Sequence, residues 1–375
     1  MSLFLIAFFL IYGSMHLYVF VRAKRAIGFS RWAGIAVALV MAVMILTPLL
    51  IRLCERAGFE TLPRIMAYVG YTWTGIIFLL VCTLLLTDLC RVILSLAGKV
   101  NWTRQSGWTF YLPLVISLTA SLYGYFEALN IRNDHITIAS PKIPREHGRI
   151  RVVQISDVHL GLIVREERLQ RILKVVRKAE PDMLVATGDI VDGQMDGLDG
   201  LSNLLADLRP RYGKYAITGN HEFYAGLDQA VTFIGKAGFT MLRDDLVTVD
   251  SLITIAGVDD PAGKSFPGYS GVPEKTVLSR APDGMFVLLL KHRPLVDADS
   301  AGLFDLQLSG HVHKGQIFPF SLLTRVYYPN YAGLLRLNEG SFLYVNRGTG
   351  TWGPPIRLFA PPEVTVIDLV HGESS

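Results

Sequence analysis

The sequence predicts a chain in two parts, an all-α bundle of about four transmembrane helices followed by an α/β domain. Of the 375 residues, 51% are apolar and only 18% are charged, whereas soluble domains carry about 25% charged residues. The charges are concentrated after residue 130, where short apolar strands repeatedly end in Asp, His or Asn. We therefore expect a membrane anchor over residues 1–130 and one large domain over residues 131–375.

Charge and cysteine content separate the same two parts. Residues 1–130 hold 10 Lys/Arg and 4 Asp/Glu, a net of +6, and residues 131–375 hold 26 and 28, a net of −2. The basic excess therefore belongs to the apolar part, and no nucleic-acid partner is expected. Cys54, Cys82 and Cys90 also fall in the first part, which excludes disulfides and thiolate zinc sites from the domain.

The first part contains four apolar stretches that are long enough to cross a bilayer, which takes about 20 helical residues. No basic residue precedes the first stretch and several follow it, so it is not a cleavable signal peptide. His16 and Asp88 are ionisable residues inside these stretches, and we expect a structural rather than a transport role for both. The stretches run roughly over Leu3–Val21, Ala33–Leu53, Ile65–Leu89 and Trp108–Leu129.

The loops between these stretches predict the orientation of the chain. Basic residues favour the cytoplasmic side, and the first and third loops together hold seven against three in the second. Four crossings then place residues 131–375 outside the cytoplasm. The basic residues are Arg22, Lys24, Arg25 and Arg31 in the first loop, Arg52, Arg56 and Arg64 in the second, and Arg91, Lys99 and Arg104 in the third.

The second part alternates strands with helical segments. Residues 131–150 are expected to hold a first strand and a connector. Residues 166–178 have helical spacing, with Leu169, Ile172, Leu173 and Val176 on one face. The strands that follow the connector are expected at Arg151–Ser156, Met183–Thr187, Tyr215–Thr218, Met285–Leu290 and Leu306–Leu308.

Each of these five strands is followed by metal-ligating residue types. Because ligands bind at the carboxyl ends of strands in α/β sheets, we expect these side chains to converge. Asp, His and Asn without Cys suit Mn, Zn or Fe, and their number exceeds what one zinc ion needs. Two metal ions are therefore expected, an arrangement used for displacement at phosphorus. The motifs are Asp157-x-His159, Gly188-Asp189-x-x-Asp192, Gly219-Asn220-His221-Glu222, Lys291-His292 and Gly310-His311-x-His313.

These five motifs, in this order over residues ~150–315, resemble those of the calcineurin-like metallophosphoesterases. Residues 344–350 (YVNRGTG) and 361–363 (PPE) are similar to the membrane-associated bacterial branch of that family, although Lys314 stands where this branch usually has Gly. The resemblance implies a four-layer αββα sandwich of two mixed sheets. It also implies a metal-dependent hydrolase in a multi-pass protein of the bacterial plasma membrane.

The resemblance also implies a role for each matched residue. One metal would be held by Asp157, His159, Asp189 and His313, and the other by Asp189, Asn220, His292 and His311. His221 would be the general acid, with Asp192 orienting its ring and raising its pKa. The metals would be Mn, Fe or Zn.

The expected reaction is hydrolysis of a phosphomonoester, phosphodiester or pyrophosphate. A membrane or envelope substrate, either a phosphorylated small molecule or a lipid-linked one, is favoured over a soluble nucleotide. Two further alternatives are a catalytically idle scaffold and a transporter or sensor with secondary phosphoesterase activity. The bilayer itself is an expected partner of the anchor.

Several residues near the motifs have two interpretations. Arg293 and Lys314 adjoin expected ligands and could bind a substrate phosphate, or they could be paired with carboxylates or solvated. Glu222 is expected to accept hydrogen bonds from a loop backbone rather than to bind metal. Residues 316–337, QIFPFSLLTRVYYPNYAGLLRL, are either a hydrophobic hairpin packed on the domain core or an interfacial patch beside the site.

Overall fold

The computed structural model describes residues 3–99, 107–193, 195, 197–198, 200–267, 269–337 and 340–373, so Arg104 of the third loop lies outside the described residues. The chain forms two compact units. The helical unit comprises Met1–Phe126 with Gly353–Leu358. The second unit comprises Glu127–Trp352 with Phe359–Ser375, and we call it the phosphoesterase unit after the resemblance of its five motifs. The division expected at residues 130/131 differs from this in two respects: it lies four residues later, and it leaves Gly353–Leu358 with the second part.

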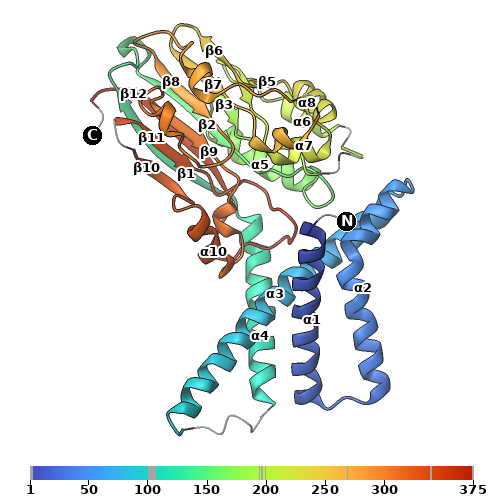
Figure 1. The fold of residues 1–375 in the computed structure, drawn as a ribbon. Coiled ribbons are helices and arrows are strands. Elements are labelled where there is room, and N and C mark those ends of the chain that lie inside the picture. The colour runs from blue at the N-terminus through green and yellow to red at the C-terminus, as the bar shows by residue number, and fades with distance from the viewer. Residues whose placement is uncertain are drawn as a thin grey trace. The chain divides into compact units, whose positions relative to one another are not determined.

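The helical unit consists of four helices, α1 (Leu3–Ile27), α2 (Arg31–Arg56), α3 (Thr61–Leu96) and α4 (Trp108–Leu129) (Figure 1). All four are long and apolar enough to span a membrane, which confirms the four expected stretches. A close approach between α2 and α3 depends on Gly70, because a Cβ there would lie 2.2 Å from the Thr47 side chain. The last residues of α4, from Glu127 on, already belong to the phosphoesterase unit.

The polar residues inside the helical unit are paired with one another. Asp88 forms an ion pair with Arg22, accepts a 2.7 Å hydrogen bond from Tyr18, and has Arg91 at 3.8 Å. Arg22 is therefore the nearer of the two cations, and the contacts of Asp88 are consistent with the expected structural role. Both ring nitrogens of His16 are also used, since Nδ1 lies 2.8 Å from the carbonyl oxygen of Tyr12 and Nε2 accepts from the Trp73 indole at 2.8 Å.

The phosphoesterase unit contains two six-stranded mixed sheets. In the first, β12 lies between β1 and β2 and is antiparallel to β2; in the second, the edge strands β6 and β10 are antiparallel to their neighbours. The first sheet has the order β1 (Arg132–Ser140), β12 (Glu363–His371), β2 (Arg149–Ile155), β3 (Met183–Ala186), β4 (Lys214–Ala216) and β5 (Thr240–Met241). The second has the order β10 (Gly333–Arg336), β11 (Phe342–Val345), β9 (Leu306–Ser309), β8 (Phe286–Leu290), β7 (Ile253–Gly257) and β6 (Asp245–Val249).

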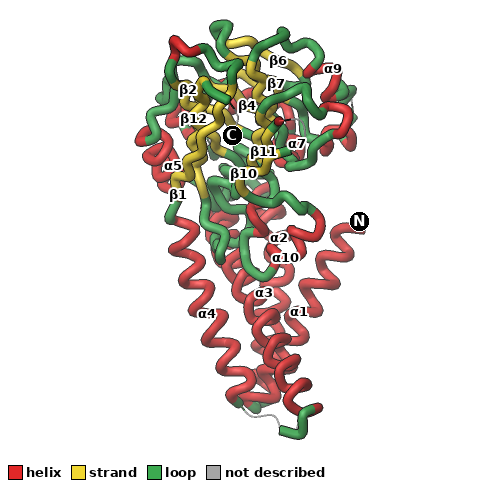
Figure 2. The backbone as a smooth tube through the Cα atoms, turned by 90° about the vertical axis from the view of Figure 1, so that its left-hand side faces the viewer, coloured by secondary structure: helices red, strands yellow, loops and turns green. Residues whose placement is uncertain are grey.

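The two sheets pack face to face over one apolar core, which takes side chains such as Val152 and Val185 from the first sheet and Ile255 and Leu288 from the second. Figure 2 shows α5 (Glu166–Lys178) on the outer side of one sheet and α9 (Glu274–Leu278) on the outer side of the other. The expected αββα layers are thereby confirmed. The remaining helices are α6 (Leu201–Ala206), α7 (Asn220–Ala225), α8 (Leu227–Lys236) and α10 (Phe320–Tyr327).

The predicted elements are present, with strand ends shifted by at most two residues. The predicted helix over residues 166–178 coincides with α5, whose Leu169, Ile172, Leu173 and Val176 are all buried. Strands β5, β6, β7, β10, β11 and β12 were not predicted. Residues 316–337 do not form a hairpin packed on the core: they form α10, whose eight residues are half-buried or exposed, followed by β10.

Candidate metal centre

The five predicted motifs follow parallel strands that deliver them to one place. β2, β3 and β4 are parallel neighbours in one sheet, and β8 and β9 are parallel neighbours in the other. Immediately after these strands the backbone turns sharply, and five of the side chains stand on residues with left-handed φ angles between 47° and 71°. This conformation costs a non-glycine residue about 1–2 kcal/mol, and such strain concentrates at functional sites. These residues are Asp157, His159, Asp189, His311 and His313.

A first group of metal-ligand atoms comes from Asp157, His159 and His313, all of them buried. The Nε2 atoms of His159 and His313 lie 3.1 Å apart. His313 Nε2 is 3.3 Å from Asp157 Oδ1, and His159 Nε2 is 3.8 Å from Asp189 Oδ2. Imidazole nitrogens that face each other at this distance with a carboxylate beside them form a donor set suited to a divalent cation.

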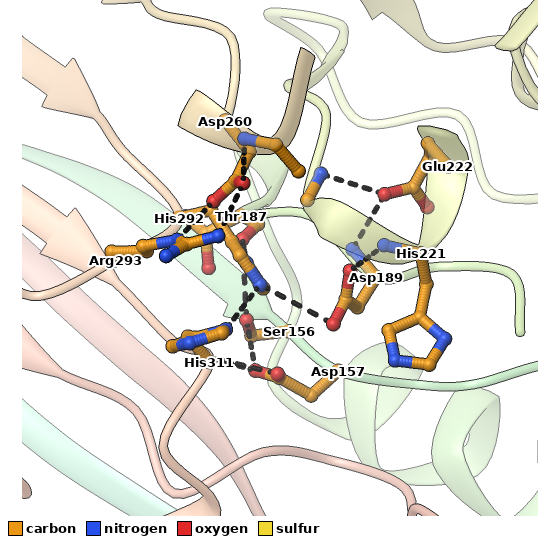
Figure 3. Close-up of polar contacts among 12 residues, drawn as sticks. Ser156, Asp157, Thr187, Asp189, His221, Glu222, Asp260, His292, Arg293 and His311 are labelled. Carbon is orange, nitrogen blue, oxygen red and sulfur yellow. Dashed lines mark hydrogen bonds and ion pairs between the residues drawn. The ribbon is translucent and has the colours of Figure 1, made fainter. Parts of the chain in front are cut away.

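A second group comes from Asp189, His292 and His311. His292 Nε2 lies 3.3 Å from Asp189 Oδ2 and 3.1 Å from His311 Nδ1. The same oxygen, Asp189 Oδ2, is therefore near a histidine of each group. Figure 3 shows Asp157, Asp189, His292 and His311 turned toward one another.

Asn220 completes the set of predicted ligands. It lies at the start of α7 and is buried, and its Oδ1 atom is without a hydrogen-bond partner among the described residues. An orphaned buried carbonyl oxygen is costly unless it binds something, so this atom also fits a metal ligand. The preceding Gly219 permits the close packing here, because a Cβ on it would lie 2.1 Å from Asp189 Oδ1.

Backbone groups and neighbouring side chains orient the candidate ligands. His292 Nδ1 lies 2.7 Å from the carbonyl oxygen of Thr187, so Nδ1 donates to that oxygen and Nε2 faces the centre. Burial alone would lower the pKa of this ring, but Asp189 and Asp157 raise the pKa to about 10, so a cation that binds here would displace the Nε2 proton. Asp157 accepts from the Ser156 hydroxyl at 2.6 Å and from the backbone N–H of His311 at 3.0 Å. Asp189 Oδ1 accepts from the N–H of His221 at 2.9 Å, which leaves Oδ2 for the centre.

Glu222 lies behind the centre and holds the loops, as predicted. Its carboxylate accepts backbone N–H groups from Asp189 at 2.9 Å, Ile190 at 2.8 Å and Gly219 at 2.6 Å. Burial and the nearby charge of Asp189 raise the pKa of Glu222 to about 7. Because its carboxylate binds backbone N–H groups of both loops, Glu222 joins the loop that carries Asp189 to the loop that carries Asn220.

Protonation differs among the histidines of the centre. Burial, reinforced by the charge of His221, lowers the pKa of His159 to about 3. Burial and the charge of His292 lower the pKa of His311 to about 4. Both rings are therefore neutral at pH 7, the form that can bind a metal ion.

His221 is paired with the other predicted catalytic residue, Asp192. His221 Nδ1 lies 2.8 Å from Asp192 Oδ1. Burial alone would lower the pKa of His221, but the charges of Asp189 and Asp192 outweigh it and raise the pKa to about 9. The ring also groups with His159 and Asp189 at metal-ligand spacing, so His221 lies directly beside the first group.

The two predicted substrate-binding residues differ in their surroundings. Arg293 is held by Asp260 through two hydrogen bonds of 2.8 and 2.9 Å (Figure 3), which corresponds to the carboxylate-paired alternative. Lys314 is half-buried in the turn after His313 and has a left-handed φ of 53°. A glycine, which the resemblance to the bacterial branch leads us to expect at this position, would adopt the same conformation without strain.

Two aromatic residues beside His221 were not predicted. The rings of Tyr224 and Trp352 lie edge-on to the His221 ring, at 5.4 and 5.8 Å between centroids. Gln316 holds Trp352 in place, since its side-chain amide donates to the Trp352 carbonyl at 2.8 Å and accepts from its N–H at 3.0 Å. Gln316 and Trp352 are separated by 35 residues in the sequence, so no local pattern indicates this contact.

Comparison with known proteins agrees with this arrangement. Residues 150–315 match the family model described as calcineurin-like phosphoesterase. An uncharacterised metallophosphoesterase of Aquifex aeolicus is 38% identical over 68% of this chain and 98% of its own length. One from Campylobacter jejuni is 28% identical over 96% of both chains.

A zebrafish (Danio rerio) transmembrane protein with a metallophosphoesterase domain is 32% identical over 69% of this chain and 62% of its own length. Members of this family use two metal ions, in keeping with the two His/Asp groups that meet at Asp189. The chain belongs to the calcineurin-like metallophosphoesterases and carries four helices apolar enough to span a membrane.

Proposed function

We propose that the protein is a membrane-anchored, dinuclear metal-dependent hydrolase of a phosphomonoester, phosphodiester or pyrophosphate. The observation that carries the proposal is the position of Asp189, whose Oδ2 atom lies 3.3 Å from His292 Nε2 and 3.8 Å from His159 Nε2. A carboxylate between two histidine groups can be shared by two cations.

Each metal position has its own ligands in this proposal. Asp157, His159, Asp189 and His313 would hold one ion, and Asp189, Asn220, His292 and His311 the other. Nitrogen and oxygen donors without sulfur suit Mn, Fe or Zn. When bound, such ions would lower the pKa of a water molecule and neutralise charge on the phosphoryl oxygens.

His221 would donate a proton to the leaving oxygen through Nε2, since Nδ1 faces Asp192 at 2.8 Å. With a pKa of about 9 the ring is protonated at neutral pH. A bound cation would compete with His221 for Asp189, but Asp192 belongs to neither ligand group and would keep the ring charged and oriented. General acid catalysis of this kind contributes about 10²–10⁴-fold.

The anchor favours a substrate carried by the membrane over a soluble nucleotide. Strand β1 begins at Arg132, directly after α4 ends at Leu129, so the domain is tethered by a very short connection. The distribution of basic residues among the loops supports a place outside the cytoplasm at a bacterial plasma membrane.

A substrate panel tests the proposal. Purified full-length protein loaded with Mn²⁺ should hydrolyse p-nitrophenyl phosphate or bis(p-nitrophenyl) phosphate, and further substrates would be a nucleotide-sugar pyrophosphate and phospholipids. Asp189→Asn should lower this activity on the order of 10³-fold. Asp368→Asn is the matched control, because Asp368 pairs with Arg151 away from the centre. Absence of hydrolysis of every aryl ester would refute the proposal.

A further inference from the structure

A group of large apolar side chains is exposed around α10. We call Phe318, Phe320, Leu322, Leu323, Val326 and Tyr327 the α10 surface. Leu323 is 65% exposed, Val326 83% and Tyr327 77%. Figure 1 shows α10 outside both sheets, beyond β10. Contiguous exposed apolar groups of this size mark an interaction surface.

One end of the α10 surface is connected by contacts to the C-terminal end of α4, the last helix that could span the membrane. The Phe318 ring packs edge-on against Phe359, with 5.9 Å between centroids. The N–H of Phe359 donates to Glu127 Oε2 at 2.9 Å, and Glu127 lies in the last turn of α4. All three residues belong to the phosphoesterase unit. Within this unit, therefore, the α10 surface lies beside the residues that continue from α4.

The other end of the α10 surface borders the metal centre. Tyr328 follows α10 directly and is buried, with its ring 5.7 Å from that of His311 and 5.0 Å from that of Tyr327. On the other side of α10, only six residues separate His313 from Phe320. Contacts of the α10 surface thus lead to Phe359 and Glu127 at one end and, through Tyr328, to the predicted metal ligand His311 at the other.

Basic residues lie among the apolar ones. The guanidinium of Arg325 lies 6.0 Å from the Tyr331 ring centroid, and that of Arg336 lies 6.0 Å from the Phe342 ring centroid. Arg325 and Arg336 are both exposed. A short amphipathic helix with aromatic, leucine and arginine side chains suits the boundary between acyl chains and phosphate head groups.

From these contacts we propose that the α10 surface lies in the head-group layer of the bilayer that α1–α4 span, and that a lipid-borne phosphate ester reaches the metal centre across it. The contact with lipid stands on the α10 surface alone. The route of the ester rests on the proposed function. We assign the bilayer as the partner of the α10 surface because Phe318 packs on Phe359, which is hydrogen-bonded to Glu127 in the last turn of α4.

Depth-dependent quenching tests the contact with lipid. The full chain, with Cys54, Cys82 and Cys90 replaced by Ser, would carry a fluorescent label at Val326→Cys in nanodiscs that contain doxyl-labelled phosphatidylcholine. The control label would be at Glu167→Cys on α5, where the side chain is 83% exposed. Quenching at position 326 should exceed quenching at position 167 at least threefold. Equal quenching would overturn the proposal, as would a shielded but unquenched label, which would indicate a protein partner.

Paired substrates with one leaving group test the route. Phosphatidyl-p-nitrophenol in the nanodisc and soluble bis(p-nitrophenyl) phosphate would be compared in Leu323→Glu/Val326→Glu. The ratio of the lipid rate to the soluble rate should fall at least tenfold. It should be unchanged in Leu295→Glu, an exposed leucine outside the α10 surface. An unchanged ratio in the double variant would overturn the route.

The two proposals fail in different ways. If the unsubstituted protein hydrolyses neither of these diesters and not p-nitrophenyl phosphate either, the proposed function fails and so does the route, while quenching at position 326 still decides the contact with lipid. If it hydrolyses a soluble ester but not the phospholipid, the proposed function stands and the lipid route is overturned.

Discussion

The helical unit and the phosphoesterase unit both bury ionisable side chains, but they neutralise them in different ways. In the helical unit, Asp88 lies between Arg22 and Arg91 and accepts a hydrogen bond from Tyr18. Opposite charges and donors meet there, so the cluster is complete in itself. His16 is likewise satisfied on both nitrogens.

In the metal centre, groups of the same kind meet instead. His159 faces His313 at 3.1 Å and His292 faces His311 at 3.1 Å, all four with a carboxylate nearby. Nitrogen and carboxylate oxygen atoms grouped in this way can be satisfied together by a cation that binds between them. The contrast shows that burial of charge does not identify a functional site; the arrangement of like donors does.

The largest expected effect tests this contrast at its centre. Asp189→Asn removes the charge that both ligand groups share. We expect kcat/KM to fall on the order of 10³-fold, which corresponds to a loss of several kcal/mol of transition-state stabilisation. The metal content measured by mass spectrometry should fall as well. Asp88→Asn should leave the metal content unchanged. Equal metal loss in both variants would contradict the distinction between the two clusters.

His221→Gln should separate proton donation from metal binding. We expect kcat to fall about 10²–10⁴-fold for an alkyl phosphoester and far less for p-nitrophenyl esters, whose leaving group needs no proton, with the metal content retained. The acid is active while protonated, so the wild-type rate should fall on the alkaline side. Asp192→Asn removes a charge that raises the pKa of His221 and should move this limb to lower pH. An unmoved limb would exclude His221 as the acid.

Asp88→Asn should destabilise the helical unit, because it leaves the buried Arg22 without its ion pair. Breaking a buried pair costs about 3–5 kcal/mol, which thermal unfolding of the detergent-solubilised protein would detect. Replacing both partners, as in Arg22→Met/Asp88→Leu, should recover most of the loss. If the double replacement unfolds at as low a temperature as Asp88→Asn, the two side chains do more than neutralise each other's charge.

The smallest effect concerns Glu363, a buried carboxylate of the domain that is paired in the manner of Asp88. Burial raises its pKa from 4.5 to about 7, with Arg347 opposing the rise and Asp134 adding to it. Between pH 4.5 and 7 the Glu363 carboxyl is therefore protonated in the folded protein but ionised in the unfolded chain. The free energy of unfolding should fall by at most about 3 kcal/mol as pH rises through this interval.

Glu363→Gln should flatten this dependence in melting curves recorded between pH 5 and 8. Asp368→Asn should not, since the pKa of Asp368 is lowered and its contribution changes only at more acidic pH. A wild-type melting temperature that rises over this interval would contradict the assignment.

Local patterns explain which parts of the fold could be predicted. The helix over residues 166–178 carries its own apolar period, and each metal-site motif directly follows an apolar strand. Glu222 was assigned correctly because its partners Gly219, Asp189 and Ile190 lie in the turns that the motifs define. In each case the information lies within a few residues.

Long-range pairing explains what was missed. Strand β12 fills the place between β1 and β2, and no local pattern specifies which strands residues 363–371 will join. The contact of Gln316 with Trp352 likewise exists only once the two loops are brought together. The exposure of α10 could not be read from its composition either, because aromatic and leucine side chains are equally common in a core.

The position of β12 imposes an order of events during synthesis. The segment before β12 binds the backbone of Ser156 and Asp157. The N–H of Gly350 donates to the backbone carbonyl oxygen of Asp157 at 3.0 Å, and Thr349 both donates to and accepts from the backbone of Ser156. At about 5–20 residues per second, the ribosome adds these residues on the order of 10–40 s after Asp157. All seven candidate ligands therefore leave the ribosome before the first sheet can close. Until residues 349 and 350 are added, the nascent domain carries all seven candidate ligands without the backbone hydrogen bonds that fix Ser156 and Asp157.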